Sequence, residues 1–254
     1  MALHVDVRGD GPPLVLLHGF TQTGRLWGPC GQALAAVHTL VAVDLPGHAG
    51  SDAERADLPG TAALVAEAVH SAIGSTPCTL LGYSLGARVA LHVLTGTGLD
   101  VRRAVLIGAT GGIEDPELRA GRRHQDDETA AALEASGDVE AFLADWVSGP
   151  MFGRLAGTAD LEERRRNTAA GLASSLRLAG TGTQEPLWDR LASLDTPLLA
   201  LAGTDDSRFA AHAVRLARLA PHAIASLVPG GGHAVHLAQP GPTSRIVTHW
   251  LSTP

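Results

Sequence analysis

The chain has 254 residues, which is enough for one large domain or two small ones. Hydrophobic residues make up 45% of it and charged residues 18%, an ordinary balance for a globular protein with a sizeable core. The net charge of −7 argues against binding to nucleic acid or to an anionic membrane surface. All 19 basic residues are arginine, which excludes Schiff-base, PLP-dependent and P-loop ATPase chemistry because these need a lysine amine.

The two cysteines, Cys30 and Cys78, are too few for a disulfide framework or a zinc ribbon, so we expect both to be reduced and buried. The amino end lacks the basic and apolar regions of a secretion signal, and no apolar run approaches the ~18 residues of a membrane span. We therefore expect a soluble, cytoplasmic protein, a monomer or weak homo-oligomer, that binds no membrane.

Short apolar runs bounded by turn residues recur along the chain, at 14–17, 40–43, 79–81, 104–107, 198–201 and 225–228. Such runs are apolar on both faces, which is the pattern of a buried parallel strand. Helical patterns lie between them, at 60–73, 85–94, 209–220 and 241–251. This alternation predicts an α/β fold with a mostly parallel, doubly wound sheet, whose ligands bind at the carboxyl ends of the strands.

The segment between residues 111 and 194 breaks the alternation, because it contains no β-branched run. We expect helices there at 116–135, 139–147, 159–178 and 186–194, with Pro116 and Pro186 in first turns. The sequence therefore predicts a core formed by residues 1–110 and 195–254, with a helical cap at 111–194 inserted over the sheet.

The segment Gly82-Tyr83-Ser84-Leu85-Gly86 matches the pattern G-x-S-x-G. In a chain with 30 glycines the bare pattern could arise by chance. Here it follows an apolar strand and opens a helical pattern, which is the context of a nucleophile elbow. The motif therefore predicts a serine nucleophile at Ser84.

A serine nucleophile needs a histidine base and an acid that orients it, and in this kind of fold they follow in the order serine, acid, histidine. His233 ends the glycine run after the last predicted strand, whereas His236 is expected on the next helix as a packing residue. After the preceding strand we favour Asp206 as the acid. Asp205 is the alternative, and we expect it to face solvent or to cap the next helix.

An oxyanion hole needs two backbone N–H groups, one after the nucleophile and one from an early loop. Leu85 provides the first, and Phe20, in the loop after the first parallel strand, provides the second. We expect the His18 side chain only to brace this loop. The Asp- and His-rich run at 44–52 lacks the spacing of a metal site and is interpreted as a structural loop beside the pocket.

Arg88 follows Ser84 by four residues, one helical turn, so the two side chains can face the same side. Nine of the 19 arginines fall in the predicted cap. We expect most of them to be solvated and paired with the acidic residues of the cap. A minority facing the serine would bind carboxylates, because a guanidinium holds a carboxylate through two parallel hydrogen bonds.

Over its full length the chain resembles the α/β-hydrolase superfamily and, within it, the 2-succinyl-6-hydroxy-2,4-cyclohexadiene-1-carboxylate synthases of menaquinone biosynthesis. The segment G-Y-S-L-G-A-R at 82–88 is similar to that family's G-Y-S-M-G-G-R. Segments at 122–127, 142–146 and 171–184 resemble its cap motifs, and the segment at 203–209 aligns Asp206 with its acid. Two departures are Ala-Thr-Gly-Gly at 109–112, where the family has S-P-G, and Arg208, where it has lysine.

The resemblance implies a lyase that eliminates pyruvate from a cyclohexene bearing succinyl and carboxylate groups. It implies that Ser84, activated by His233 and Asp206, removes a ring proton while the Phe20 and Leu85 N–H groups hold the developing charge. It assigns the substrate carboxylates and the pocket lining to side chains at Arg88, Arg122, Arg166, Tyr83, Trp146 and Gln184. It implies a small anionic carboxylate substrate and no metal or organic cofactor. The alternative is a serine hydrolase of esters or C–C bonds with the same triad.

Overall fold

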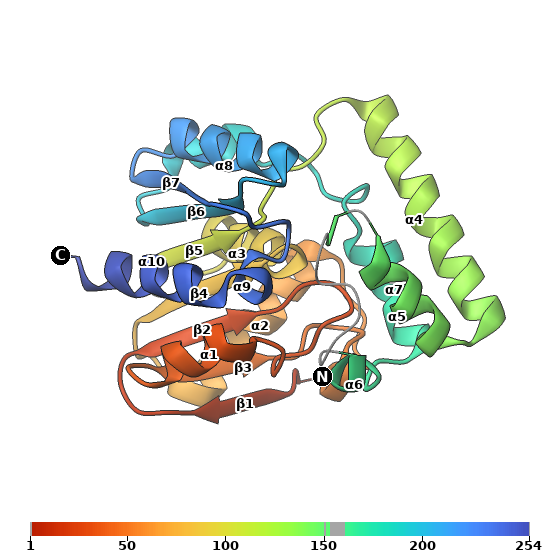
Figure 1. Ribbon diagram of the computed structural model, residues 1–254, viewed down its shortest axis with the longest axis horizontal. Helices are drawn as coiled ribbons and strands as arrows, with labels where there is room; N and C mark the ends of the chain where they lie inside the picture. The colour runs from red at the N-terminus through yellow and green to blue at the C-terminus, as the bar shows by residue number, and fades with distance from the viewer. Residues whose placement is uncertain (1, 150, 153–160, 254) are drawn as a thin grey trace.

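A computed structural model of the protein describes residues 2–149, 151–152 and 161–253 (Figure 1). Within these residues seven strands form one sheet in the order β1-β3-β2-β4-β5-β6-β7. Strand β1 (Val5–Arg8) pairs antiparallel with β3 (Thr39–Val43). All other neighbouring strands are parallel. After β3 the order continues with β2 (Pro13–Leu17), β4 (Cys78–Tyr83), β5 (Val101–Ile107), β6 (Leu198–Gly203) and β7 (Ala223–Val228). The six predicted parallel strands are therefore confirmed.

Helices cover both faces of the sheet. One layer holds α1 (Gly28–Ala35), α9 (Val235–Ala238) and α10 (Pro240–Ser252), and the other holds α2 (Leu58–Ile73), α3 (Leu85–Gly96) and α8 (Ser207–Leu219). Successive side chains of a strand point to opposite faces, so on β2 Leu14 and Leu16 pack into the first layer while Val15 and Leu17 pack into the second. The expected doubly wound fold, buried on both faces, is confirmed.

Between β5 and β6 the chain is helical. It forms α4 (Pro116–Ser136), α5 (Val139–Ser148), α6 (Leu161–Arg164), α7 (Ala169–Ala179) and a 3-10 segment η3 (Trp188–Ser193). Figure 1 shows α4, α5 and α7 beside the sheet, at the end toward which the parallel strands point. This arrangement supports the division into a core (1–110 and 195–254) and a cap (111–194), which we keep as a proposal.

Three elements differ from the sequence prediction. The helix expected at 159–178 begins outside the described residues, and its described part is broken between α6 and α7. Asn167 lies at this break, and its side-chain amide donates to the carbonyl oxygens of Thr21 and Arg164. The segment expected as a helix at 186–194 forms the shorter η3. Helix α1 is not predicted, because Gly28, with φ of 51°, and its neighbours are weak helix formers.

Cys30 and Cys78 are free and buried, as expected. Burial raises the pKa of the Cys30 thiol to about 12 and that of Cys78, beside Asp100, to about 11. Both thiols are therefore protonated and poorly nucleophilic at neutral pH. No helix in the described ranges is long and apolar enough to cross a membrane.

Candidate active site

Ser84 lies at the tight turn that joins β4 to α3. Its backbone has φ of 51° and ψ of −106°, a conformation that residues with a side chain rarely adopt. Its N–H donates to the carbonyl oxygen of Ile107 on β5 at 2.8 Å, and the Gly86 N–H donates to that of His18 at 2.9 Å. The turn is thus tied to the chain on both sides of β4, with Ser84 at the carboxyl edge of the sheet.

The two glycines of the motif are required by close packing. A Cβ atom at Gly82 would collide with the carbonyl oxygen of Gly86 and the backbone of Ala87. A Cβ atom at Gly86 would collide with the carbonyl group of Leu17 on β2. Helix α3 therefore starts against the backbone of β2, and only glycine allows this approach.

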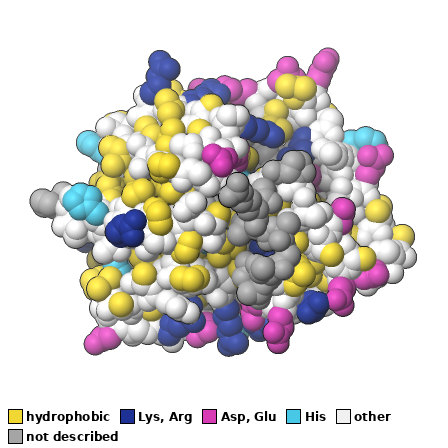
Figure 2. Space-filling model, in the orientation of Figure 1, with side chains coloured by type: hydrophobic (Ala, Val, Ile, Leu, Met, Phe, Trp, Pro, Cys, Tyr) yellow, Lys and Arg dark blue, Asp and Glu magenta, His cyan; other side chains and the backbone are white. Residues whose placement is uncertain are grey.

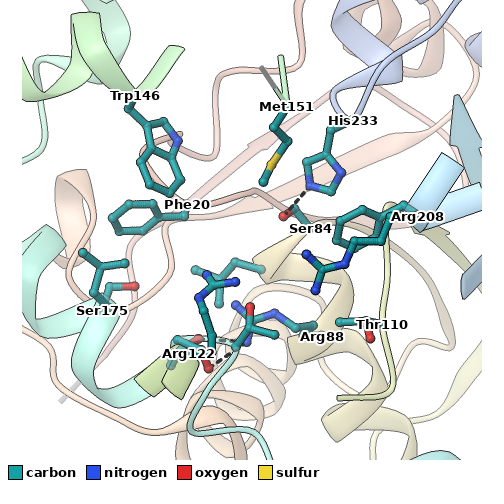
Figure 3. Close-up of a pocket in the computed structure, with 16 residues that line it drawn as sticks. Phe20, Ser84, Arg88, Thr110, Arg122, Trp146, Met151, Ser175, Arg208 and His233 are labelled. Carbon is teal, nitrogen blue, oxygen red and sulfur yellow. Dashed lines mark hydrogen bonds between the residues drawn. The ribbon is translucent and has the colours of Figure 1, made fainter. Parts of the chain in front are cut away.

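Ser84, His233 and Asp206 form a hydrogen-bonded chain. His233 Nε2 lies 2.9 Å from Ser84 Oγ (Figure 3), and on the other side of the ring His233 Nδ1 lies 3.0 Å from Asp206 Oδ2. With a proton on Nδ1, the imidazole donates to the carboxylate and accepts from the serine hydroxyl, which is the arrangement of a serine activated by a general base. His233 is 3% exposed, so bulk water does not compete strongly for these bonds.

Asp206, rather than Asp205, faces the histidine. Its second oxygen, Oδ1, accepts from the Phe209 N–H at 3.1 Å and caps α8. Burial alone would raise the pKa of the Asp206 carboxyl, but the hydrogen bonds to His233 and Phe209 outweigh it and hold the pKa below its usual range. Asp205 is exposed and accepts from the neighbouring Thr204 hydroxyl. The helix cap that was considered for Asp205 is thus provided by Asp206 itself.

Three buried histidines surround this site. His18 Nδ1 donates to the Gly19 carbonyl oxygen at 2.8 Å while its Nε2 accepts from the Leu45 N–H at 3.0 Å, so the ring is neutral and braces the loop. Burial lowers the pKa of His18 to about 4 and that of His48, beside His18, to about 3. Burial also lowers the pKa of His236 to about 3; its ring packs 4.4 Å from that of Tyr83. All three are therefore uncharged at neutral pH.

A pocket of about 640 Å³, counting its open mouth, lies over Ser84 between the core and the helices that follow β5 (Figure 3). The core elements contribute Phe20, Ser84, Leu85, Arg88, Thr110, Arg208, Phe209 and His233 to its lining, and the helical segment contributes Arg122, Trp146, Met151, Ser175, Leu176, Ala179, Gly180 and Thr181.

Three of the residues that line this pocket are arginines, Arg88, Arg122 and Arg208, and none of the described lining residues is acidic. Arg88 Nη1 donates to the carbonyl oxygens of Ala179 and Gly180, at 2.9 and 3.2 Å. Burial lowers the pKa of Arg88 to about 10, which leaves it cationic at neutral pH. Arg122 Nε donates to Asp126 at 2.8 Å. The pocket is therefore electropositive, although the chain as a whole is acidic.

The opposite wall of the pocket is aromatic. The ring centroid of Phe20 lies 5.0 Å from that of Trp146 and 6.3 Å from that of Phe142. Trp146 Nε1 is buried and has no hydrogen-bond partner among the described residues. A ligand in this pocket therefore meets aromatic, apolar surface on one side and guanidinium groups on the other.

Two backbone N–H groups are available beside Ser84. The N–H groups of Phe20 and Leu85 make no hydrogen bond to another described residue. Both residues line the pocket next to Ser84. Available amides at this position have the properties that an oxyanion hole requires.

Three residues that the resemblance assigns to the substrate do not line the pocket. Tyr83 is 2% exposed and packs between the rings of His233 and His236. Gln184 is 1% exposed, and its amide lies 3.4 Å from the carbonyl oxygen of Thr110. Arg166 is absent from the pocket lining and pairs with Glu163 at 2.6 Å. The structure therefore does not bring Arg166 into the pocket to which the resemblance assigns it.

Two arginines that sequence reasoning did not select are placed close to the site. Arg164 is 3% exposed and donates to the Thr21 hydroxyl, in the loop that carries Phe20. It lies two residues before Arg166, about half a helical turn, so the two side chains leave the chain in different directions. Arg208 enters the pocket from the first turn of α8. The only signal for Arg208 was its position two residues after Asp206.

Several other arginines lie on the surface and pair with acids. Examples are Arg177 with Glu134 at 2.7 Å and Arg215 with Glu114 at 2.6 Å. Figure 2 shows basic and acidic side chains interspersed over the visible face rather than gathered by sign. In the cap, where most arginines were expected to be solvated and paired, Arg119, Arg165, Arg166 and Arg177 each pair with an acid.

The chain matches the alpha/beta hydrolase family over residues 14–246. It is 33% identical to a 2-succinyl-6-hydroxy-2,4-cyclohexadiene-1-carboxylate synthase of Klebsiella pneumoniae, over 90% of this chain and 89% of that protein. It is 30% identical to the synthase of the same name from Serratia proteamaculans, over 96% and 95%. Among solved structures, MenH from S. aureus superimposes with a TM-score of 0.90 and 26% identity, covering 98% of this chain and 97% of that one. An esterase from a Rhodococcus species superimposes with a TM-score of 0.74 and 28% identity, covering 100% and 99%.

The three buried histidines predict a loss of stability on mild acidification. In the unfolded chain they take up protons below a pKa of about 6.5, whereas their folded pKa values lie near 3 to 4. Stability is therefore fully present above pH 6.5 and falls as pH drops toward the folded pKa values. Each histidine contributes a loss of about 1.4 kcal/mol between pH 7.5 and pH 5.5.

Urea unfolding at the two pH values measures this loss. In His236→Leu the loss should be smaller by about one histidine's share, whereas His249→Gln, at an exposed position, should leave it unchanged. An unfolding free energy of the wild-type protein that stays flat between pH 7.5 and pH 5.5 would contradict the assignment of neutral buried rings.

The packing of Gly86 predicts that Gly86→Ala destabilises the protein by about 2 kcal/mol or more, because the new methyl group overlaps the backbone of β2. Gly96→Ala, at the other end of α3, is the matched control, since a Cβ atom there meets nothing within 4 Å. That control should be neutral or stabilising by up to about 1 kcal/mol. Thermal unfolding compares the two variants, and equal melting temperatures would show that α3 does not need this close approach.

Proposed function

Because the chain belongs to the alpha/beta hydrolase family and, within it, to the 2-succinyl-6-hydroxy-2,4-cyclohexadiene-1-carboxylate synthases, we propose that it is a lyase of menaquinone biosynthesis. The reaction eliminates pyruvate from a cyclohexene that carries a succinyl group and a carboxylate. The observation that carries this proposal is the set of three arginines, with no described acidic residue, lining the pocket over Ser84. An ester hydrolase needs a mainly apolar acyl site there instead.

The hydrogen-bonded chain of Ser84, His233 and Asp206 provides the base. His233 Nε2, 2.9 Å from Ser84 Oγ, accepts the hydroxyl proton while Ser84 Oγ takes a proton from a ring carbon of the substrate. The electron pair of that C–H bond forms the new ring double bond as the C–O bond to the three-carbon leaving group breaks. His233 then returns its proton to the leaving group, which is released as pyruvate, so no water is consumed.

Charge that develops on the substrate carbonyl is held by the Phe20 and Leu85 N–H groups. The donors are fixed before the reaction: α3 orients Leu85, and the His18 ring braces the loop of Phe20. Donors that are already in place stabilise a transition state without a cost of reorganisation. The same two groups would serve an ester hydrolase, so they support catalysis at Ser84 without separating the two reactions.

Arg88 and Arg122 bind substrate carboxylates. Arg88 bonds backbone carbonyls through Nη1 alone, and Arg122 bonds Asp126 through Nε alone. Each keeps other N–H donors for a carboxylate, which a guanidinium holds strongly when water is excluded. The Trp146 indole N–H, which has no described partner, is a further donor to the substrate. The two free, buried cysteines suit a reducing compartment, so we place the enzyme in the cytoplasm.

The direct test supplies the pyruvate-bearing precursor and follows pyruvate release by a coupled assay. We expect turnover by the wild-type protein and a loss of at least about 10³-fold in Ser84→Ala, because the proton-abstracting group is removed. The hydrolysis of p-nitrophenyl esters is measured beside it. No pyruvate release together with rapid ester cleavage would favour the alternative, a serine hydrolase.

A second prediction separates a substrate-binding arginine from a surface one. Arg122→Gln should lower kcat/KM for the precursor by about 10- to 100-fold, because one charge-assisted pair to a carboxylate is lost. Arg166→Gln is the matched control: Arg166 belongs to the same segment and also pairs with an acid, but it lies outside the pocket. The control should stay within about threefold of the wild type. Equal effects of the two substitutions would contradict a carboxylate site at Arg122.

A further inference from the structure

Arg208 is the third arginine of the pocket, and it enters from a different side than the other two. It is the second residue of α8, two residues after Asp206. Figure 3 shows its guanidinium pointing into the pocket from the side of His233, across from Arg122. The Phe209 ring contacts both groups: its centroid is 4.2 Å from that of His233 and 5.7 Å from the Arg208 guanidinium carbon. Arg208 therefore lies on the side of the pocket that holds the base.

The guanidinium of Arg208 has no ion-pair or hydrogen-bond partner among the described residues. Arg88 and Arg122, by contrast, each use one nitrogen for a protein oxygen. Arg208 also lies in the first turn of α8, where the positive end of the helix dipole opposes a cation. An exposed arginine that contacts the Phe209 ring but no described anionic or hydrogen-bonding group, and that enters an electropositive pocket, is placed to bind an anion.

The chemistry of the proposed reaction identifies this anion. The substrate carries three carboxylates: one on the ring, one on the succinyl group and one on the leaving group that becomes pyruvate. The pocket presents three arginines. On the basis of the proposed function, we propose that Arg208 binds the carboxylate of the leaving group and determines the specificity for a substrate that releases a 2-oxo acid.

The position of Arg208 distinguishes this carboxylate from the other two. Arg88 is buried and Arg122 is about one-third exposed, so they suit the parts of the substrate that stay on the ring. Arg208 is the exposed member, on the side of His233, where the leaving group receives its proton. A cation there stabilises the negative charge that builds up on the departing group as the C–O bond breaks. After the reaction Arg208 holds pyruvate at the exposed side of the pocket, so pyruvate can leave before the ring product.

The test compares Arg208→Gln, Arg208→Lys and Arg218→Gln. Arg218 lies on the same helix, is exposed and is absent from the pocket, so its variant should behave as the wild type. Arg208→Gln should lower kcat/KM for the precursor by about 10- to 100-fold and weaken product inhibition by pyruvate by about tenfold or more. Inhibition by the ring product, which keeps the other two carboxylates, should change by less than about twofold. Arg208→Lys keeps the charge and restores the residue that the resembled family has at this position, so it should recover most of the activity that Arg208→Gln loses.

The readouts separate substrate binding from an indirect effect on the triad. The charge of Arg208 also helps to hold the pKa of Asp206 down, but a loss through Asp206 would not change inhibition by pyruvate selectively. Unchanged pyruvate inhibition in Arg208→Gln, or an equal loss of inhibition by both products, would overturn the inference while leaving the lyase intact. No measurable pyruvate inhibition of the active wild type would also overturn it. No pyruvate release by the wild type would instead overturn the proposed function, and this inference with it.

Discussion

The contact between the start of α3 and the backbone of β2 is the constraint on which the site depends. Gly86 lies against the Leu17 carbonyl group and donates to the His18 carbonyl oxygen, so the turn at Ser84 and the loop of Phe20 are held as one unit. This contact fixes the reactive hydroxyl and two N–H donors around one small volume. His233 also packs closely against the backbone, at Gly108, since a Cβ atom there would lie 2.8 Å from His233 Cε1. The strain at Ser84 is thus stored in a rigid frame.

The charges around Ser84 determine which ligands the site can bind. Asp206 sits behind His233 and is absent from the pocket lining, so its negative charge orients the base without repelling an anionic ligand. Arg88 is held by two neutral carbonyl groups, which fix its position and leave its positive charge uncompensated. An esterase of similar fold can share the triad and the backbone donors. Under the proposed function, the guanidinium groups over Ser84 direct the same machinery to a polyanionic substrate.

Properties set by local sequence could be predicted, and those set by distant contacts could not. The six parallel strands follow from apolar runs, and Ser84, His233 and Asp206 follow from the strand ends that carry them. At the break between α6 and α7, Asn167 depends on Thr21, 146 residues away in the chain, for one of its hydrogen bonds. The different surroundings of Arg164 and Arg166 also depend on distant contacts, because the sequence around two arginines in one run does not show which of them is buried after folding. Arg208 is a further case: it follows the acid Asp206 by two residues, and only the fold shows that it lines the pocket.

The use of arginine alone as the basic residue has a physical consequence at this site. A lysine has one nitrogen, so an ammonium group bonded to the carbonyl oxygens of Ala179 and Gly180 would have little left for a ligand. Arg88 makes both bonds through Nη1 and keeps Nε and Nη2, just as Arg122 uses Nε for Asp126 and keeps its terminal nitrogens. One side chain can thus be anchored to the protein and still present a planar pair of donors. Anchored guanidinium groups lose less conformational entropy on binding a carboxylate, which favours recognition of a substrate with several fixed negative charges.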